Sequence, residues 1–321
     1  MHNGPFGAFR TGRFFYPPDV PRDPLYICGT TASGKTSLAL SLAEALDGEI
    51  VNGDAFQVYR GLEVLSAAPS AGEMMQVPHH LFGFLSMEEK MDAARYAGLA
   101  KPVMEEIQTR GKLPIVVGGS GLYLKFLTHG VSEAPSADPV LRAELDKLAV
   151  EELLRRLQEL DPEEAARQVK QNSNNHRHLS RALEICLLTE GTASERRRNF
   201  DVSLDELNLK GVVLTWDREV LAERIQLRTA LMLEHGAIDE VRALPQNADT
   251  VRQAIGVKEI ESYLAEECTR EECLEKIAIS TRQYAKRQRN WFRREQWLHP
   301  LDGEKSTDEL VEKTKALIAP C

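Results

Sequence analysis

Residues 29–36, GTTASGKT, carry the clearest chemical signature of the chain. Gly29 and Gly34 are the first and sixth residues of this segment, and Lys35 and Thr36 follow. This spacing is typical of a phosphate-binding loop. The backbone N–H groups of residues 31–36 can surround an anionic oxygen, and the positive end of the following helix strengthens the attraction. Lys35 supplies a positive charge, and the Thr36 hydroxyl is suited to a Mg²⁺ ion that neutralises the phosphates. The sequence therefore predicts a bound di- or triphosphate.

A strand-like segment, residues 113–119, bears on whether this loop serves nucleotide hydrolysis. Hydrolysing P-loop proteins hold Mg²⁺ with a carboxylate at the end of a hydrophobic strand. In this chain the apolar segment LPIVVGG runs into Ser120, and no carboxylate follows directly. The missing acid disfavours a motor or a switch that splits a nucleotide.

Asp54 ends another strand-like segment, residues 48–54, with the sequence GEIVNGD. Ligands of open α/β sheets bind at the carboxyl ends of the strands, so we expect Asp54 to lie near the phosphate-binding loop. A carboxylate at that place could act as a general base or hold Mg²⁺. Its position is also compatible with the N-cap of a helix that begins at Ala55. The residues alone leave these roles open.

A basic stretch, residues 280–294, contrasts with the net charge of −9 of the whole chain. It contains six Arg and Lys residues and no acid. If the stretch is helical, one face presents Arg282, Lys286, Arg289 and Arg293. Such a face can bind the phosphate groups of a nucleic acid, although a solvated surface that packs through its aromatic residues is the alternative.

Helical patterns without a strand fill residues 139–198, after the turn-rich stretch SEAPSADP. A second basic group, formed by Arg177, His178 and Arg181, lies among these expected helices. Two basic sites on separate elements suit an extended polyanion better than a small ligand. We therefore expect a helical insertion at residues 129–198.

Strand-like and helical segments alternate outside this insertion. The expected strands are residues 24–29, 48–54, 113–119 and 210–216, and the expected helices are residues 36–46, 217–243, 256–265 and 270–297. Alternation of this kind predicts a parallel α/β sheet. The predicted fold is α/β, with a P-loop NTPase-like parallel sheet core at residues 25–128 and 199–321 and an inserted all-helical domain at 129–198. Residues 1–24 lack periodicity and form an N-terminal extension in this prediction.

Composition places limits on the location of the protein. The five cysteines are odd in number and form no C-x-x-C pair, which disfavours a disulfide framework or a zinc finger. The N-terminal residues lack the apolar region of a signal peptide, and no run approaches the about 18 apolar residues of a membrane span. We expect a cytoplasmic protein without membrane contact.

An ordered set of motifs between residues 25 and 302 resembles the tRNA dimethylallyltransferases, or tRNA isopentenyltransferases, of the bacterial type. The motifs are GTTASGKTSLAL, NGDAFQVYRGL, PHHLFG, IVVGGSGLYLKFL, PSADP, HLSRALEI, RQAIGVKEI and TRQYAKRQRNWFR. The resemblance implies transfer of a dimethylallyl group from dimethylallyl diphosphate to N6 of the adenine just 3′ of the anticodon. The loop would then hold the diphosphate of the donor with Mg²⁺, and diphosphate would be the leaving group. That role agrees with the missing carboxylate.

The resemblance also implies roles for individual residues. It implies Asp54 as the general base, Lys35 and Thr36 as further catalytic residues, and Thr36 as the Mg²⁺ ligand. Diphosphate binding is implied for Gly29, Thr30, Thr31, Ala32, Ser33, Gly34, Lys35, Thr36, Arg224 and Arg228. Contact with the tRNA anticodon stem-loop is implied for Asp54, Ala55, Phe56, Gln57, Ser120, Arg142, Arg177, His178, Leu179, Ser180, Arg181, Arg252, Gln253, Ala254, Ile255, Gly256, Lys258, Arg282, Lys286 and Arg289. A monomer is expected, since two parts of one chain would hold the tRNA.

Three positions depart from the family pattern. Residues 65–69, LSAAP, stand where the family usually has Gly-Thr-Ala-Lys-Pro, so a lysine is missing. Ser120 replaces a common threonine and keeps the hydroxyl, and His178 stands where arginine is frequent. The departures leave the loop, Asp54 and the basic stretch intact.

Other functions share part of these features. An adenylate dimethylallyltransferase, which acts on free AMP, ADP or ATP, would share the loop and Asp54 but would not need the two basic groups. A small-molecule P-loop kinase would use ATP as donor and would need no polyanion surface. A tRNA-binding protein without catalysis would not need Lys35, Thr36 and Asp54 together.

Overall fold

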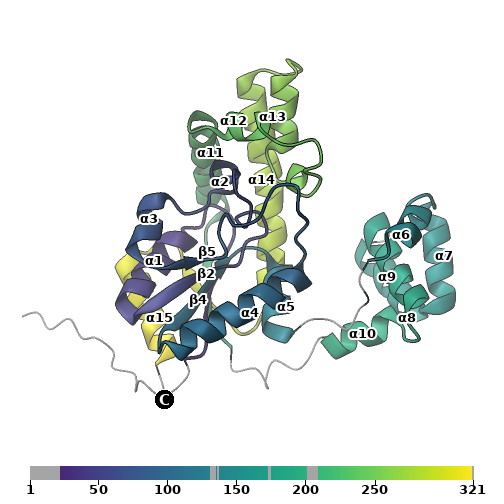
Figure 1. The fold of residues 1–321 in the computed structure, drawn as a ribbon, viewed down its shortest axis with the longest axis horizontal. Helices are drawn as coiled ribbons and strands as arrows, with labels where there is room; N and C mark the ends of the chain where they lie inside the picture. The colour runs from purple at the N-terminus through teal and green to yellow at the C-terminus, as the bar shows by residue number, and fades with distance from the viewer. Residues whose placement is uncertain (1–21, 131–134, 136, 173–174, 201–208, 320–321) are drawn as a thin grey trace, which may run out of the picture. The chain divides into compact units, whose positions relative to one another are not determined.

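The computed structural model describes residues 22–130, 135, 137–172, 175–200 and 209–319 (Figure 1). The chain divides into two compact units: residues 1–124 with 208–321, and residues 125–207. The predicted insertion, residues 129–198, differs from the second unit by a few residues at each end. Helix α5 (Gly121–His129) crosses the first of these boundaries. Most of the predicted N-terminal extension lies outside the described residues.

The first unit is built on a six-stranded sheet in which every pair of neighbours is parallel. The strand order is β3-β2-β4-β1-β5-β6. Four strands lie where the sequence predicts them: β1 (Leu25–Gly29), β2 (Gly48–Asn52), β4 (Leu113–Gly118) and β5 (Lys210–Thr215). The α/β fold class with a parallel sheet is therefore confirmed. The two edge strands, β3 (His79–His80) and β6 (Leu298–Asp302), are not among the predicted strands.

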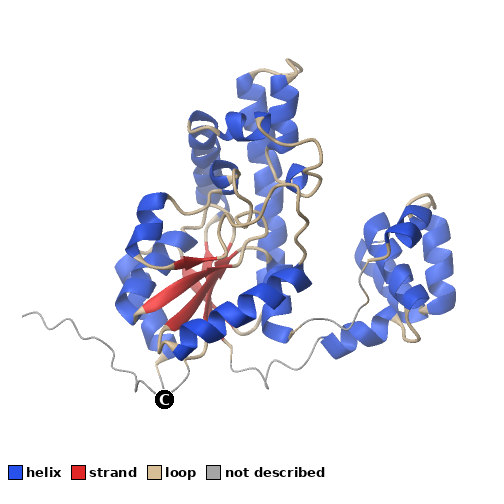
Figure 2. Ribbon diagram, in the orientation of Figure 1, coloured by secondary structure: helices blue, strands red, loops and turns tan. Residues whose placement is uncertain are grey.

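Helices cover both faces of the sheet (Figures 1 and 2). Helices α1 (Lys35–Leu46) and α15 (Thr307–Ile318) pack on one face, where Leu25 and Ile27 of β1 join a shared apolar core. Helix α4 (Ala93–Thr109) packs on the opposite face. Successive side chains of a strand point alternately to the two faces of the sheet. Because the central strands are buried on both faces, they are almost wholly apolar.

A group of helices stands beyond the sheet (Figure 1). It comprises α11 (Arg218–Glu234), α12 (Ala237–Arg242), α13 (Val257–Leu264) and α14 (Arg270–Phe292). The single helix predicted at 217–243 is two helices, because Gly236 adopts a left-handed conformation, with φ 112°, between them. Three short helices complete the unit: α2 (Glu63–Ser66), α3 (Ala71–Gln76) and the 3₁₀ turn Val251–Gln253.

The second unit contains only helices among its described residues. They are α6 (Pro139–Leu145), α7 (Val150–Leu160), α8 (Pro162–Asn172), α9 (His176–Leu188) and α10 (Ala193–Phe200). Leu153, Leu157 and Leu183 belong to its own apolar core. Within the described parts of both units, no helix combines the length and apolar character needed to cross a bilayer.

Candidate active site

The phosphate-binding loop joins β1 to α1 and lines a cavity of about 590 Å³. Gly34 precedes the helix with φ 88°, a left-handed conformation that glycine adopts without strain. The ammonium group of Lys35 donates a hydrogen bond to the carbonyl of Thr30 at 2.7 Å. Lys35 and Thr36 both line the cavity, as the sequence predicts for a loop that holds phosphate.

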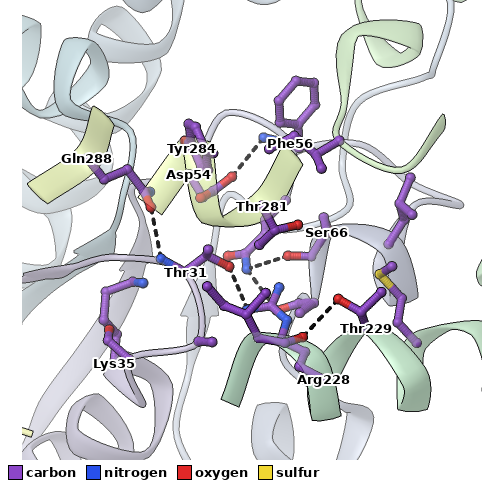
Figure 3. A pocket seen from close by; sticks show the side chains of 18 of the residues that line it. Thr31, Lys35, Asp54, Phe56, Ser66, Arg228, Thr229, Thr281, Tyr284 and Gln288 are labelled. Atoms are coloured by element: carbon purple, nitrogen blue, oxygen red, sulfur yellow. Dashed lines mark hydrogen bonds between the residues drawn. The ribbon is translucent and has the colours of Figure 1, made fainter. Parts of the chain in front are cut away.

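Backbone N–H groups of the loop have protein partners in this structure. The N–H of Thr31 donates to Oε1 of Gln288 at 2.9 Å (Figure 3). The N–H of Ser33 donates to the carbonyl of Thr30 at 3.4 Å. Contact of the N–H groups of residues 31–36 with an anion stays a prediction. Gln288 comes from α14, far along the chain, and the loop sequence carries no sign of this contact.

Two arginines of α11 hold the loop from the cavity side. Arg224 donates through Nε to the carbonyl of Ala32 at 2.9 Å and lies over the ring of Trp216, 4.1 Å from its centroid. Arg228 donates through Nη1 to Oγ1 of Thr31 at 2.9 Å. Both arginines line the cavity, next to the loop to which the sequence analysis assigned them.

The positive groups of the cavity affect one another. Desolvation lowers the pKa of Lys35 to about 8; the charge of Asp54 opposes this shift and that of Arg228 adds to it. Desolvation also lowers the pKa of Arg228, again opposed by Asp54. An anion that enters the cavity therefore meets poorly solvated cations, to which it binds more strongly than it would in water.

Asp54 lies in the same cavity, in a loop rather than at a helix start. Its N–H donates to Oδ1 of Asn52 at 2.8 Å, and its own Oδ1 accepts the N–H of Phe56 at 3.0 Å. These bonds form a local turn, so the alternative in which Asp54 caps a helix from Ala55 is wrong. Among the described residues that line the cavity, Asp54 is the only carboxylate.

The wall opposite the loop is partly apolar. Sequence reasoning placed Phe56, Gln253, Ala254 and Ile255 near the tRNA, and all four line the cavity. It missed the other lining residues, which are Leu65, Ser66, Ala67, Val117, Gly118, Ile225, Leu227, Thr229, Leu231, Met232, Ile277, Thr281, Tyr284, Arg287 and Gln288. The unusual composition of residues 65–69 and the spacing of apolar residues on α11 are the only sequence signals for this wall.

Gln57 and Ser120 hold the Asp54 loop in place. The side-chain amide of Gln57 donates to the carbonyls of Ser66 at 3.2 Å and Ala67 at 2.8 Å. Ser120 accepts the N–H of Ala55 through its hydroxyl at 3.0 Å. The hydroxyl that Ser120 shares with the family's usual threonine thus has a structural partner.

The basic residues outside the cavity divide into paired and exposed groups. Arg252 pairs with Glu261, and Arg282 pairs with Glu275 at 2.9 Å. Lys258 and Lys286 are exposed. Gly256, with φ 100°, is the N-cap of α13. Burial lowers the pKa of Arg289, and the charges of Arg218 and Arg293 act in the same direction. Arg289 thus belongs to a local concentration of positive charge.

The predicted tRNA contacts of the second unit have different surroundings. Glu184, whose side chain is buried, pairs with Arg142 at 3.1 Å and Arg181 at 2.5 Å. Arg177 and His178 are exposed on α9. Leu179 and Ser180 are buried, so these two side chains present no surface to RNA and instead anchor the helix. Burial and the charges of Arg167 and Arg177 lower the pKa of His178, which leaves it neutral at neutral pH.

Comparison with known proteins identifies the family. The family model described as IPP transferase matches residues 57–295. A tRNA dimethylallyltransferase of Akkermansia muciniphila is 44% identical over 282 residues, which cover 88% of this chain and 94% of the relative. A tRNA dimethylallyltransferase of Bacillus mycoides is 39% identical over 298 residues, which cover 88% and 92%.

Solved structures agree with this assignment. The full-length tRNA isopentenylpyrophosphate transferase of Bacillus halodurans matches with a TM-score of 0.68 and 34% identity, covering 93% of this chain and 96% of that one. A eukaryotic dimethylallyltransferase acting on tRNA matches with a TM-score of 0.75 and 28% identity, covering 88% and 74%. The chain belongs to the IPP transferase family, the tRNA dimethylallyltransferases.

Proposed function

We propose that this protein transfers a dimethylallyl group from dimethylallyl diphosphate to N6 of adenine 37, the base 3′ of the anticodon in tRNA, and releases diphosphate. The observation that carries the proposal is the shared cavity, in which a single carboxylate, Asp54, lies with a phosphate-binding loop and the side chains of Lys35 and Arg228. Similarity to tRNA dimethylallyltransferases supports the choice of donor and acceptor.

The loop and its cations act on the leaving group. As the bond between the allylic carbon and the diphosphate oxygen breaks, negative charge develops on the diphosphate. Lys35, Arg224 and Arg228 surround the place where the loop would hold it, and fixed positive groups stabilise charge that forms during the reaction. Nothing in this step requires cleavage of a nucleotide.

Mg²⁺ fits the residues of the cavity. Thr36 opens α1 beside the loop, and Asp54 offers a carboxylate in the same cavity. Mg²⁺ commonly takes one or two oxygen ligands from the protein and the rest from phosphates and water. Thr36 would hold the ion, which would neutralise part of the charge of the diphosphate.

Asp54 acts on the acceptor. The N6 amine of adenine is a weak nucleophile because its lone pair is delocalised into the ring. As nitrogen bonds to the allylic carbon, Asp54 takes one proton from N6, while the electron pair of the breaking carbon–oxygen bond leaves with the diphosphate. The adenine must leave its stack to reach the cavity, as in other enzymes that modify bases.

The acceptor is RNA in this proposal, not free adenylate. Exposed cations that suit a phosphate backbone lie on both units, Arg177 on α9 and Lys286 on α14. A cavity that served AMP alone would gain nothing from them. We propose that one chain suffices, because every group assigned to the reaction comes from the same protomer.

Labelled dimethylallyl diphosphate tests the proposal when the protein and Mg²⁺ are incubated with an anticodon stem-loop, with the same stem-loop carrying guanine at the target position, or with AMP. We expect label only on the stem-loop that carries adenine. Label on AMP alone would assign an adenylate dimethylallyltransferase, and transfer of phosphate from ATP to an acceptor would assign a kinase.

A further inference from the structure

A buried amide joins the phosphate-binding loop to a second loop of the sheet edge. Gln288 is only 5% exposed in the middle of α14. Its Oε1 accepts the N–H of Thr31 at 2.9 Å, and its Nε2 donates to the carbonyl of Gly119 at 2.9 Å. A Cβ atom at Gly119 would lie 2.2 Å from Nε2, so a glycine is required for this approach. Both ends of the amide are therefore fixed.

Ser120, the residue after Gly119, extends the connection. Its hydroxyl accepts the N–H of Ala55, the residue after Asp54, at 3.0 Å. The hydrogen bonds of Gln288 and Ser120, joined by the peptide bond between Gly119 and Ser120, thus connect the phosphate-binding loop to the Asp54 loop (Figure 3 shows Thr31, Gln288 and Asp54).

The strand order explains why such a connection is needed. The phosphate-binding loop follows β1 and the Asp54 loop follows β2, but β4 lies between these two strands. Gly119 and Ser120 follow β4, so they occupy the middle of the three loops. Helix α14 contacts the first and middle loops directly and reaches the Asp54 loop through Ser120.

We propose that Gln288 is a positioning residue that fixes the donor-binding loop relative to the general base. This inference rests on the proposed function, in which the diphosphate is held at one loop and the accepting amine at the other. Attack on the allylic carbon requires both partners to be aligned at once, and a displacement of about 1 Å can cost on the order of a hundredfold in rate. The side chain of Gln288 need not touch the reacting atoms.

Three substitutions test the connection at separate points. Gln288→Met keeps the length of the side chain and removes both polar ends. Ser120→Ala removes the link to Ala55, whereas Ser120→Thr keeps it. Gln283→Met is the matched control, since Gln283 is exposed on the same helix and does not line the cavity. Thermal unfolding of each variant shows whether it folds.

We expect Gln288→Met and Ser120→Ala each to lower kcat for transfer to the stem-loop by about tenfold or more. KM for the RNA should stay within about threefold, Ser120→Thr should recover most of the kcat that Ser120→Ala loses, and Gln283→Met should retain the activity of the wild type. Because the two side chains belong to one connection, the double variant Ser120→Ala/Gln288→Met should lose no more than the worse single variant.

Three results would overturn the inference: losses that multiply in the double variant, a change confined to KM, or full kcat in a folded Gln288→Met or Ser120→Ala protein. If Gln288→Met fails to fold, the Ser120 variants still decide the question. Failure of the proposed function would look different, because the wild-type protein itself would then transfer no label to the stem-loop.

Discussion

Lys35 has to be charged to bind a diphosphate, yet it lies where water is scarce. Desolvation lowers its pKa to about 8, and of the groups that oppose this shift Asp54 has the largest effect. A part of the free protein therefore carries a neutral Lys35 at pH values slightly above neutrality. A bound diphosphate would restore the charge, because a nearby anion favours the protonated amine.

We predict that kcat/KM for the donor is constant below pH 8 and falls as the pH rises through about 8. The direction of this change in kcat/KM follows from the pKa of Lys35 in the free protein. Raising the pH removes the proton that gives Lys35 the charge needed to bind the diphosphate. Steady-state rates at saturating stem-loop RNA, measured over a pH range that brackets this value, give the profile. A Lys35→Arg variant stays charged and should show no such fall, whatever its absolute rate. A flat wild-type profile would contradict the assignment.

The positions of single residues were predictable where a local motif or the geometry of the sheet edge determines them. The place of Lys35 and Thr36 in the cavity follows from the loop pattern, and that of Asp54 follows from its position after a strand. The same approach could not foresee that Arg142 and Arg181 share the buried carboxylate of Glu184. That pairing depends on how α6 packs against α9, which spacing within either helix does not reveal.

At the scale of elements, α12 supports the wall of the cavity through α2. Glu240 of α12 accepts the N–H groups of Val64 and Leu65 at 2.7 and 2.8 Å, through both carboxylate oxygens. The carbonyls at the other end of α2, those of Ser66 and Ala67, hold the amide of Gln57. The segment that departs from the family pattern is thus anchored at both ends.

Glu240→Ala should lower the free energy of unfolding by about 1–3 kcal/mol, because it removes two hydrogen bonds to a charged group at a partly buried site. Urea unfolding followed by circular dichroism gives the value. Asp239→Asn, a change at an exposed neighbour whose partner is Arg242 of the same helix, should cost less than about 0.5 kcal/mol. Equal changes in the free energy of unfolding for the two substitutions would show that the contact of Glu240 with α2 does not contribute to stability.

The elements themselves were predictable to different degrees. Buried central strands and amphipathic helices have periodic sequences, and the predicted segments agree closely with β1, β2, β4 and β5. The edge strands lack such a pattern: β3 has only two residues, and β6 carries Pro300, with Leu298 and Leu301 buried and its other three residues exposed. Pairing with a neighbouring strand, rather than their own composition, makes these segments strands.

At the scale of the whole molecule, the proposed function divides the work between two units. The cavity proposed for the donor, with Asp54, belongs to the first unit, while the exposed basic residues Arg177 and His178 lie on α9 of the second. Phosphate contacts by such residues add affinity without affecting the donor. Their effect on RNA binding should therefore be separable from chemistry by its dependence on salt.

Arg177→Ala should weaken stem-loop binding. It should also make the slope of the logarithm of the association constant against the logarithm of salt concentration less negative by about 1, the amount expected for one phosphate contact. Fluorescence anisotropy with a labelled stem-loop at several salt concentrations measures the slope. Donor binding should not change. An unaltered slope would remove Arg177 from the RNA contacts.

His178→Arg should act in the opposite direction. The histidine is neutral at neutral pH because burial and nearby arginines lower its pKa. Arginine stays charged, so the variant should bind the stem-loop more tightly near pH 7 and make the salt slope more negative by about 1. Weaker binding, or no change, in the same anisotropy titration would show that this position does not face the RNA.

The most direct test of the central claim is the single-turnover rate of prenyl transfer by wild-type protein and Asp54→Asn, at saturating donor and stem-loop. A general base contributes about a hundredfold to ten-thousandfold, so the variant should lose at least a hundredfold in rate. Its affinity for diphosphate should be equal or higher, because the substitution removes a negative charge from the cavity. Transfer by Asp54→Asn within about tenfold of the wild type, with RNA and donor both bound, would contradict the assignment of Asp54 as the base.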